Sequence, residues 1–257
     1  MIHWQDKTRF HIGSTAFRCY DWVFGSQPST AQEYFLQKDA AMVRDYLELV
    51  QRLKPRQIVE LGIWQGGSCV FFNELCRPQK MVAMELSTEP VPALEHYLCH
   101  SAHGHSLSTF YGIDQADNTA LTGIISAEFG NTPLDLVVDD ASHFVAETRS
   151  SFNVLFPRLR PGGAYVIEDW AWAHDPVDDP QGAVDLYPDK EPLSRLVFEF
   201  ILAAGSTQGI IQHIEVDRHR VTAYRGDAEI PQADFDISQL CLKRGKAMLA
   251  QHPPGGA

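Results

Sequence analysis

The stretch LDLVVDDASH, residues 134–143, decides the fold, because an apolar, β-branched run stops abruptly in acidic residues. A second stretch, AYVIEDW at residues 164–170, ends in the same way. Runs of this kind are typical of buried parallel strands that helices cover on both faces. PGG, residues 161–163, is predicted to turn the chain into the second strand. Both stretches therefore indicate an α/β protein.

Polar side chains follow both predicted strands, and the carboxyl ends of such strands are where open α/β sheets place their ligands. Asp139, Asp140, His143, Glu168 and Asp169 should gather at one edge of the sheet. Four carboxylates need a compensating cation or strongly shifted pKa values. The simplest explanation is a divalent metal ion with His143 nearby as a base. The alternative for any one of these residues is a helix cap or a solvent-facing side chain.

Predicted strands alternate with predicted helices along the middle of the chain, which implies βαβ units. The strands are expected at residues 57–61, 81–86, 108–113, 134–139 and 165–168, and the helices up to residue 76 and at 91–99, 118–129 and 146–159. A helix at residues 193–204 and a hairpin formed by residues 210–216 and 220–224 should follow.

These elements predict a Rossmann-like α/β fold with a seven-stranded, mostly parallel sheet, an antiparallel last strand and helices on both faces. Residues 54–228 would form this domain, and residues 229–257 a C-terminal extension. Residues 1–53 show helical patterns, for example at 30–53, and no strand signal. We therefore expect a helical cap or oligomerisation segment there.

ELGIWQGGS, residues 60–68, joins the first strand to its helix. Glycine allows a tight turn and lets a ligand approach backbone amides at a helix N-terminus. Gly62, Gly66 and Ser68 are therefore candidate cofactor contacts, although a purely structural turn is the alternative. The spacing does not fit GxGxxG, which counts against a dinucleotide and an NAD-dependent dehydrogenase.

Glu85 closes the second strand, at a position where an acidic residue commonly accepts hydrogen bonds from ribose hydroxyls. Asp114 and Gln115 end the third strand, where polar side chains can reach an adenine. Together these residues describe a nucleoside without phosphates. S-adenosylmethionine fits, with Glu60 or Asp139 facing its ammonium group.

The combination of ELGIWQGGS, MELS at residues 84–87, YGIDQAD at 111–117, VVDDASHF at 137–144 and PGGAYVIEDW at 161–170 resembles a known family. It is similar to the class I, S-adenosylmethionine-dependent sugar O-methyltransferases of the macrocin and mycinamicin type, over about residues 58–170. A related group methylates sugars of mycobacterial polysaccharides. The chain departs from this pattern after Asp169, which leaves the acceptor open.

This resemblance implies a class I methyltransferase fold and transfer of a methyl group to a hydroxyl of a sugar, glycoside or oligosaccharide. Carried onto matching positions, it implies Mg²⁺, or Mn²⁺ as a substitute, held by Asp140, Glu168 and Asp169. His143 would be the general base. Independently of the resemblance, His174 is a second candidate base. The cofactor contacts that it implies are Asp139, Glu60, Gly62, Glu85 and Asp114.

Two competing functions use the same residues differently. A metal-dependent hydrolase or hydroxylase of the cephalosporin-hydroxylase-like group would use the carboxylates but leave Glu85 and the glycine turn unexplained. A non-catalytic nucleoside-binding protein would not need Asp140, His143 and the acidic pair at residues 168–169. Binding of S-adenosylhomocysteine and metal-dependent turnover distinguish these alternatives.

Composition constrains partners and location. The 257 residues include 21 Lys and Arg against 33 Asp and Glu, a net charge of −12 that argues against a nucleic-acid partner. The five cysteines form no CxxC pair, which favours reduced thiols and a cytoplasmic protein. No apolar run is long enough to span a membrane, and no signal-peptide core is evident. We expect a cytoplasmic homo-oligomer.

Overall fold

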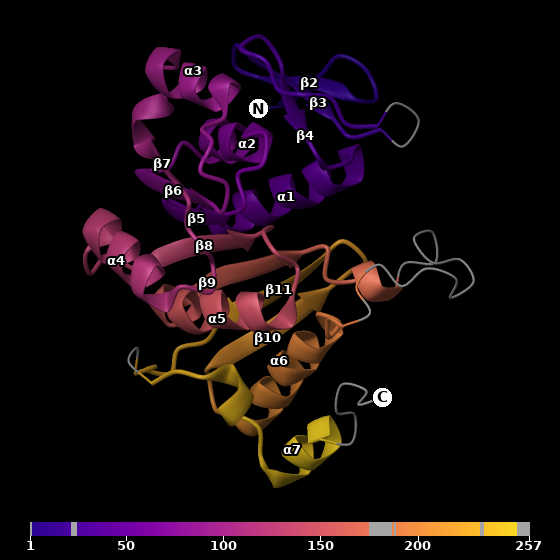
Figure 1. Ribbon diagram of the computed structural model, residues 1–257, viewed down its shortest axis with the longest axis vertical. Helices are drawn as coiled ribbons and strands as arrows, with labels where there is room; N and C mark the ends of the chain where they lie inside the picture. Colours follow the sequence, from indigo (N-terminus) through magenta and orange to yellow (C-terminus); the bar gives the residue numbers. More distant parts are fainter. Residues whose placement is uncertain (1, 22–24, 175–186, 188, 232–233, 251–257) are drawn as a thin grey trace. The chain divides into compact units, whose positions relative to one another are not determined.

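The computed structural model describes residues 2–21, 25–174, 187, 189–231 and 234–250 (Figure 1). The chain divides into two compact units, which we describe separately. The first comprises residues 1–114 and 123–135, and the second residues 115–122 and 136–257. Helix α4 (Asn118–Phe129) and strand β8 (Leu134–Asp139) each contain residues of both units.

The larger sheet has seven strands in the order β10-β11-β9-β8-β5-β6-β7. Strands β5 (Gln57–Leu61), β6 (Lys80–Glu85) and β7 (Leu107–Tyr111) pair in parallel. The last strand, β11 (Arg220–Arg225), pairs antiparallel with both β9 (Leu159–Glu168) and β10 (Ile211–Val216). The mostly parallel seven-stranded sheet with an antiparallel last strand, predicted from the sequence, is confirmed.

Helices connect these strands: α2 (Gly67–Cys76), α3 (Pro92–His100), α5 (Val145–Leu155) and α6 (Ser194–Ser206). Helix α7 (Lys243–Ala250) follows near the C-terminus. All six residues of β8 are buried, as expected for a strand covered on both faces. None of the helices in the described part of the chain is long and apolar enough to cross a membrane.

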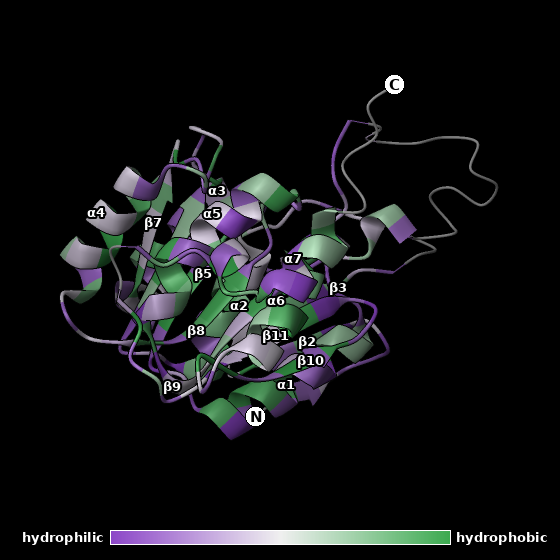
Figure 2. Ribbon diagram, turned by 90° about the horizontal axis from the view of Figure 1, so that it is seen from below, coloured by the Kyte–Doolittle hydropathy of each residue, from purple (hydrophilic) through white to green (hydrophobic). Residues whose placement is uncertain are grey.

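Helix α1 (Ala40–Leu53) shows how local sequence sets an element. The Asp39 side chain caps its N-terminus by accepting hydrogen bonds from the backbone N–H groups of Ala41 and Met42, at 2.7 and 2.9 Å. Lys54 ends the helix in a left-handed conformation and donates its N–H to the carbonyl of Val50. Hydrophobic and hydrophilic residues alternate along α1 in Figure 2, because one face is buried and the other exposed.

The predicted helical segment at residues 1–53 is wrong for most of its length. Four short strands form a separate sheet there: β1 (Ile2–Trp4), β2 (Arg9–Ile12), β3 (Thr15–Cys19) and β4 (Tyr34–Leu36). Phe10 of β2 stacks on Phe17 of β3 with ring centroids 5.1 Å apart, and both contact Phe71 of α2 edge-on. Side chains alternate between the two faces of these strands, so the relevant period was two residues.

The turn predicted at residues 161–163 is also wrong. Strand β9 already begins at Leu159 and runs through Pro161 and Gly162 to Glu168, and helix α5 ends earlier, at Leu155. Gly162 has φ +75°, a conformation that glycine adopts without steric cost, so the strand continues through this residue.

Candidate functional site

The glycine turn after β5 is shaped by the packing of the first unit. Gly62 and Gly66 have φ values of +91° and +75°, and Gly66 is the N-cap of α2. A Cβ atom added to Gly66 would lie 2.9 Å from the Cβ of Leu94, and one added to Gly67 would lie 1.7 Å from the carbonyl oxygen of Phe35. Glycine is therefore required here by the protein's own contacts, whatever the turn binds.

Glu85, at the end of β6, closes this turn. Its Oε2 atom accepts hydrogen bonds from the backbone N–H groups of Ile63 and Trp64, both at 2.9 Å. Its Oε1 atom accepts from the N–H of Ser87 at 3.0 Å. The carboxylate thus fixes the turn between β5 and α2, and its predicted contact with a ribose stays a prediction.

The other predicted cofactor residues of the first unit differ in exposure. Glu60 is fully buried beside Cys69, and burial together with the Glu60 carboxylate raises the pKa of the Cys69 thiol. Ser68 is partly exposed in the first turn of α2, and Asp114 is exposed after β7. Among these residues, Ser68 and Asp114 are the ones that a ligand could reach without rearrangement.

Asp139 and Gln115 lie in a buried polar network of the second unit. Asp139 accepts hydrogen bonds from the Tyr165 hydroxyl at 2.7 Å, the Ser151 hydroxyl at 2.8 Å and the Gln115 amide at 3.1 Å. Burial raises the pKa of Asp139, and these donors oppose that shift by stabilising the carboxylate. Sequence reasoning missed Ser151 and Tyr165 as partners of Asp139. The one available signal was the polar hydroxyl of Tyr165 inside the otherwise apolar run at residues 164–167.

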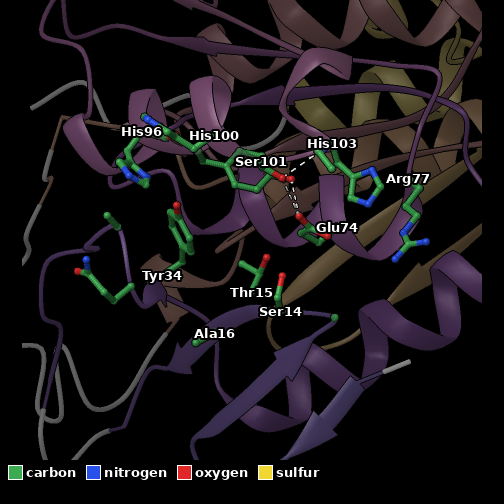
Figure 3. Close-up of a pocket in the computed structure, with 15 residues that line it drawn as sticks. Ser14, Thr15, Ala16, Tyr34, Glu74, Arg77, His96, His100, Ser101 and His103 are labelled. Atoms are coloured by element: carbon green, nitrogen blue, oxygen red, sulfur yellow. Dashed lines mark hydrogen bonds between the residues drawn. The ribbon is translucent and has the colours of Figure 1, made fainter.

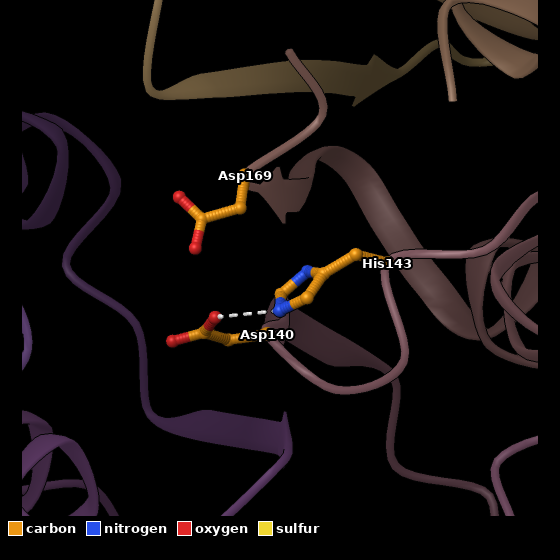
Figure 4. A group of neighbouring side chains, drawn as sticks. All are labelled: Asp140, His143 and Asp169. Atoms are coloured by element: carbon orange, nitrogen blue, oxygen red, sulfur yellow. Dashed lines mark ion pairs between the residues drawn. The ribbon is translucent and has the colours of Figure 1, made fainter. Parts of the chain in front are cut away.

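Asp140, His143 and Asp169 converge in the second unit (Figure 4). Each offers one ligand atom, and these atoms all lie within 4.8 Å of one another. His143 Nε2 is 3.9 Å from Asp140 Oδ1. The two carboxylates are oxygen ligands of the kind that suit a divalent cation such as Mg²⁺ or Mn²⁺, and the His143 imidazole lies beside them.

Backbone conformation distinguishes two of these three residues. His143 and Asp169 have φ values of +58° and +50°, in the left-handed region that residues other than glycine rarely adopt. Such conformations persist where the surrounding structure enforces them, and they cluster at functional sites. Glu168, predicted as a third acidic ligand, is buried at the end of β9 and is not part of the group within 4.8 Å. Its role as a ligand stays a prediction.

Aromatic residues flank the loop that carries His143. Trp172 Nε1 donates a hydrogen bond to the carbonyl oxygen of His143 at 2.9 Å. Phe144, Trp172 and Tyr187 contact one another edge to face, with ring centroids 5.2 to 6.3 Å apart. Their mutual packing holds this loop. His174, the alternative base, is exposed and bonds to Ser194 Oγ at 3.1 Å.

A cavity of about 420 Å³ lies elsewhere, in the first unit (Figure 3). Its lining includes Arg77, His96, His100 and His103, and the buried Glu74 accepts a hydrogen bond from the Ser101 hydroxyl at 3.2 Å. None of the site residues predicted from the sequence lines this cavity.

Comparisons with known proteins point to a methyltransferase domain in the middle of the chain. Residues 59–170 match a family model described as a methyltransferase domain. Demethylmacrocin O-methyltransferase from Streptomyces fradiae is 32% identical over 127 residues, which cover 47% of this chain and 29% of that protein. Mycinamicin VI 2''-O-methyltransferase from Micromonospora griseorubida is 57% identical over 44 residues, 17% of this chain and 11% of that protein. The predicted resemblance to sugar O-methyltransferases is confirmed, and the chain spans less than a third of these relatives.

Solved structures share the fold. MycE methyltransferase from the mycinamycin pathway, in complex with Mg, SAH and mycinamycin VI, is 24% identical, with a TM-score of 0.53 over 73% of this chain and 51% of that chain. TomG from Streptomyces achromogenes, in complex with SAM, is 17% identical with a TM-score of 0.53, covering 74% and 82% of the respective chains. At these identities the likeness establishes the fold alone.

Proposed function

We propose that this chain, whose residues 59–170 match a methyltransferase domain model, transfers a methyl group from S-adenosylmethionine to a hydroxyl of a sugar or glycoside. The observation that carries the proposal is the convergence of Asp140, His143 and Asp169 within a domain similar to sugar O-methyltransferases. The hydrolase, hydroxylase and nucleoside-binding alternatives gain no support from these relatives.

Cofactor binding is assigned to the residues around the glycine turn. The N–H groups at the start of α2 and the partly exposed Ser68 are suited to the amino-acid end of the cofactor, and the Glu85 carboxylate to its ribose. Glu60, Gly62, Gly66 and Asp114 complete the proposed set in the first unit, and the sequence also predicts Gln115 and Asp139 of the second unit as cofactor contacts. S-adenosylmethionine would supply an electrophilic methyl group whose bond to sulfur breaks as the acceptor oxygen bonds to the carbon.

Asp140 and Asp169 would hold a divalent metal ion, Mg²⁺ or Mn²⁺, with Glu168 proposed as a further ligand. The ion would supply positive charge that favours ionisation of a substrate hydroxyl. Asp140 and Asp169 would then orient the acceptor, since orientation supplies much of the acceleration in such transfers.

His143 would be the general base that takes the hydroxyl proton. Its Nε2 atom lies 3.9 Å from Asp140 Oδ1, so the carboxylate can stabilise the imidazolium that forms. The hydrogen bond from Trp172 to the His143 carbonyl keeps the loop backbone in place while the proton moves.

Two partners are proposed. One is a small-molecule or oligosaccharide acceptor, and the other is a second copy of the chain. A homo-oligomer is supported by large apolar side chains that stay about half exposed on α6, namely Phe198 at 50% and Ile201 at 48%. Five cysteines without a disulfide fit a reducing compartment such as the cytoplasm.

Calorimetry with S-adenosylhomocysteine tests the cofactor assignment. Glu85→Ala should weaken binding by the equivalent of one or two charge-assisted hydrogen bonds, about 1.5–3 kcal/mol each. Glu89→Ala is the matched control, because it removes an exposed carboxylate from the loop after the same strand. Equal affinity in the folded Glu85→Ala protein would remove Glu85 from the cofactor site.

A further inference from the structure

The loop formed by residues 140–144 carries Asp140 and His143, and side chains of Gln115 and Trp172 hydrogen-bond to its backbone. Ser142 donates its N–H to Gln115 Oε1 at 2.8 Å. Trp172 Nε1 donates to the carbonyl oxygen of His143 at 2.9 Å from the other side. Between these anchors His143 adopts its left-handed conformation, φ +58°. The geometry of the acidic cluster, by which we mean Asp140, Asp169 and the neighbouring His143, therefore depends on groups outside these three residues.

Gln115 is itself held firmly. The side chain is 7% exposed, and its Nε2 atom donates to Asp139 Oδ1 at 3.1 Å and to Ser151 Oγ at 3.1 Å. A carboxylate can only accept hydrogen bonds, so Asp139 determines which end of the Gln115 amide faces it. The amide oxygen is thereby directed to the N–H of Ser142.

Asp139 cannot easily turn away from Gln115, because two further donors hold its carboxylate. The Tyr165 hydroxyl from β9 donates to Oδ2 at 2.7 Å, and the Ser151 hydroxyl from α5 donates to the same atom at 2.8 Å. Strand β9, helix α5 and the end of β8 thus meet in one buried polar network. Fully satisfied networks of this kind fix a single arrangement of the groups around them.

We propose that Gln115, oriented by Asp139, is a positioning residue that sets the placement of Asp140 and His143 through the Ser142 amide. This inference rests on the proposed function for the role of the cluster. It gives Gln115 and Asp139 a task that requires no contact with cofactor or substrate, in place of the cofactor contact expected from the sequence. Partners that orient metal ligands typically change metal affinity by about 10–100-fold when they are removed.

Gln115→Met is the direct test, because methionine has a similar length and lacks both the amide donor and the amide acceptor. Asn73→Leu is the matched control: Asn73 is also a buried carboxamide, bonded to the Tyr97 hydroxyl, the His103 carbonyl and the Ser106 hydroxyl, but in the first unit. Both variants should lower Tm, because both lose buried hydrogen bonds.

Three measurements on the full chain separate the outcomes: hydrogen exchange at the Ser142 amide without metal, Mn²⁺ affinity by electron paramagnetic resonance, and S-adenosylhomocysteine affinity by calorimetry. Gln115→Met should speed exchange at Ser142 and weaken Mn²⁺ binding about tenfold or more, with cofactor affinity unchanged. Asn73→Leu should change neither Ser142 exchange nor Mn²⁺ affinity. If Gln115→Met does not fold, Gln115→Asn, which shortens the carboxamide by one methylene, serves the same test.

Unchanged Ser142 exchange and Mn²⁺ affinity in a folded Gln115 variant would overturn the proposal. Loss of cofactor affinity with Mn²⁺ binding preserved would also overturn it and would make Gln115 a cofactor contact. If the unaltered protein binds no Mn²⁺, the proposed metal-dependent function fails, while Ser142 exchange still decides whether Gln115 positions the loop.

Discussion

His143 and Asp169 hold backbone conformations that cost roughly 1–3 kcal/mol for a residue other than glycine, and both belong to the acidic cluster. Asparagine tolerates the left-handed region better than most residues. Asp169→Asn should therefore keep the backbone at φ +50° while it removes one negative charge from the cluster. This substitution separates the chemistry of the residue from its conformation.

We expect Asp169→Asn to weaken Mn²⁺ binding by at least about tenfold, since it removes a proposed carboxylate ligand, and to leave Tm nearly unchanged. Electron paramagnetic resonance of free Mn²⁺ and a thermal melt measure the two effects. Asp234→Asn, which neutralises an exposed carboxylate, is the control. Wild-type Mn²⁺ affinity in Asp169→Asn would show that Asp169 is not a ligand.

Trp172→Phe probes the loop from the other side. The phenyl ring retains edge contacts with Phe144 and Tyr187, whereas the indole N–H that donates to the His143 carbonyl is lost. One neutral hydrogen bond contributes about 0.5–1.5 kcal/mol, so Tm should fall slightly. The rate of methyl transfer should fall by a larger factor than this small loss of stability explains, because the proposed base, His143, lies on this loop. A steady-state assay that finds unchanged kcat would contradict this role of Trp172.

At the scale of elements, the sequence predicted the larger sheet well, because buried parallel strands read as continuous apolar runs. Strand β8 is an example: all its residues are buried, and its bounds match those predicted, 134–139. The N-terminal sheet was missed because strands of three to five residues give too few periods to distinguish from a helix. The 161–163 turn was wrong because Pro161 and Gly162 lie inside β9, where glycine adopts the φ of +75° without steric cost and the strand continues.

The acidic ends of β8 and β9 predicted the cluster, but not its internal order. Asp139 and Asp140 are adjacent in sequence, yet one is 2% exposed in a polar network and the other belongs to the cluster. The positions of Gln115, Ser151 and Tyr165, which lie 12 to 26 residues away along the chain, decide this difference. A single sequence does not encode such long-range hydrogen bonds in any local pattern.

The turn between β1 and β2 makes a prediction about acid stability. Asp6 Oδ1 accepts hydrogen bonds from the N–H groups of Thr8 and Arg9, both at 2.7 Å, and these bonds lower the pKa of Asp6 below 3.8. A carboxyl whose pKa is lowered in the folded state stabilises the protein above its unfolded pKa. That contribution disappears as the pH falls through the folded value.

Asp6→Ala should therefore lower Tm at pH 7, and the difference from the unaltered protein should narrow below about pH 4, where the carboxyl of the unfolded chain becomes protonated. Thermal melts of both proteins across this range measure the difference. A gap that stays constant down to the lowest pH would show that the ionised carboxylate is not what stabilises the turn.

At the scale of the whole molecule, cysteine reactivity should reflect burial. Burial raises the pKa of Cys19 and of Cys76 to about 12 in each case, whereas Cys99 is exposed. Only the thiolate reacts with disulfide reagents. Titration of the native protein with a disulfide reagent should find one fast-reacting thiol, and this thiol should be absent from Cys99→Ser. All five thiols should react after denaturation. Several fast thiols in the native protein would contradict the packing around Cys19, Cys69 and Cys241.

The proposed assembly can be tested at the same scale. Light scattering should give a mass that is a multiple of the chain's own mass, and Phe198→Asp should shift it toward that of a single chain, since the exposed apolar surface on α6 would be interrupted. If the protein is a monomer at every concentration, it does not form the proposed homo-oligomer, and the proposed chemistry is unaffected.

Metal-dependent transfer of a methyl group from S-adenosylmethionine to a sugar hydroxyl can be measured by incubating the purified chain with methyl-labelled S-adenosylmethionine, Mg²⁺ and a panel of glycosides. We predict that label enters a glycoside as an O-methyl group, that excess chelator abolishes the transfer and added Mg²⁺ restores it, and that His143→Ala lowers kcat by about 10²–10⁴-fold without changing cofactor affinity. Full transfer in excess chelator, with normal kcat in His143→Ala, would contradict the account.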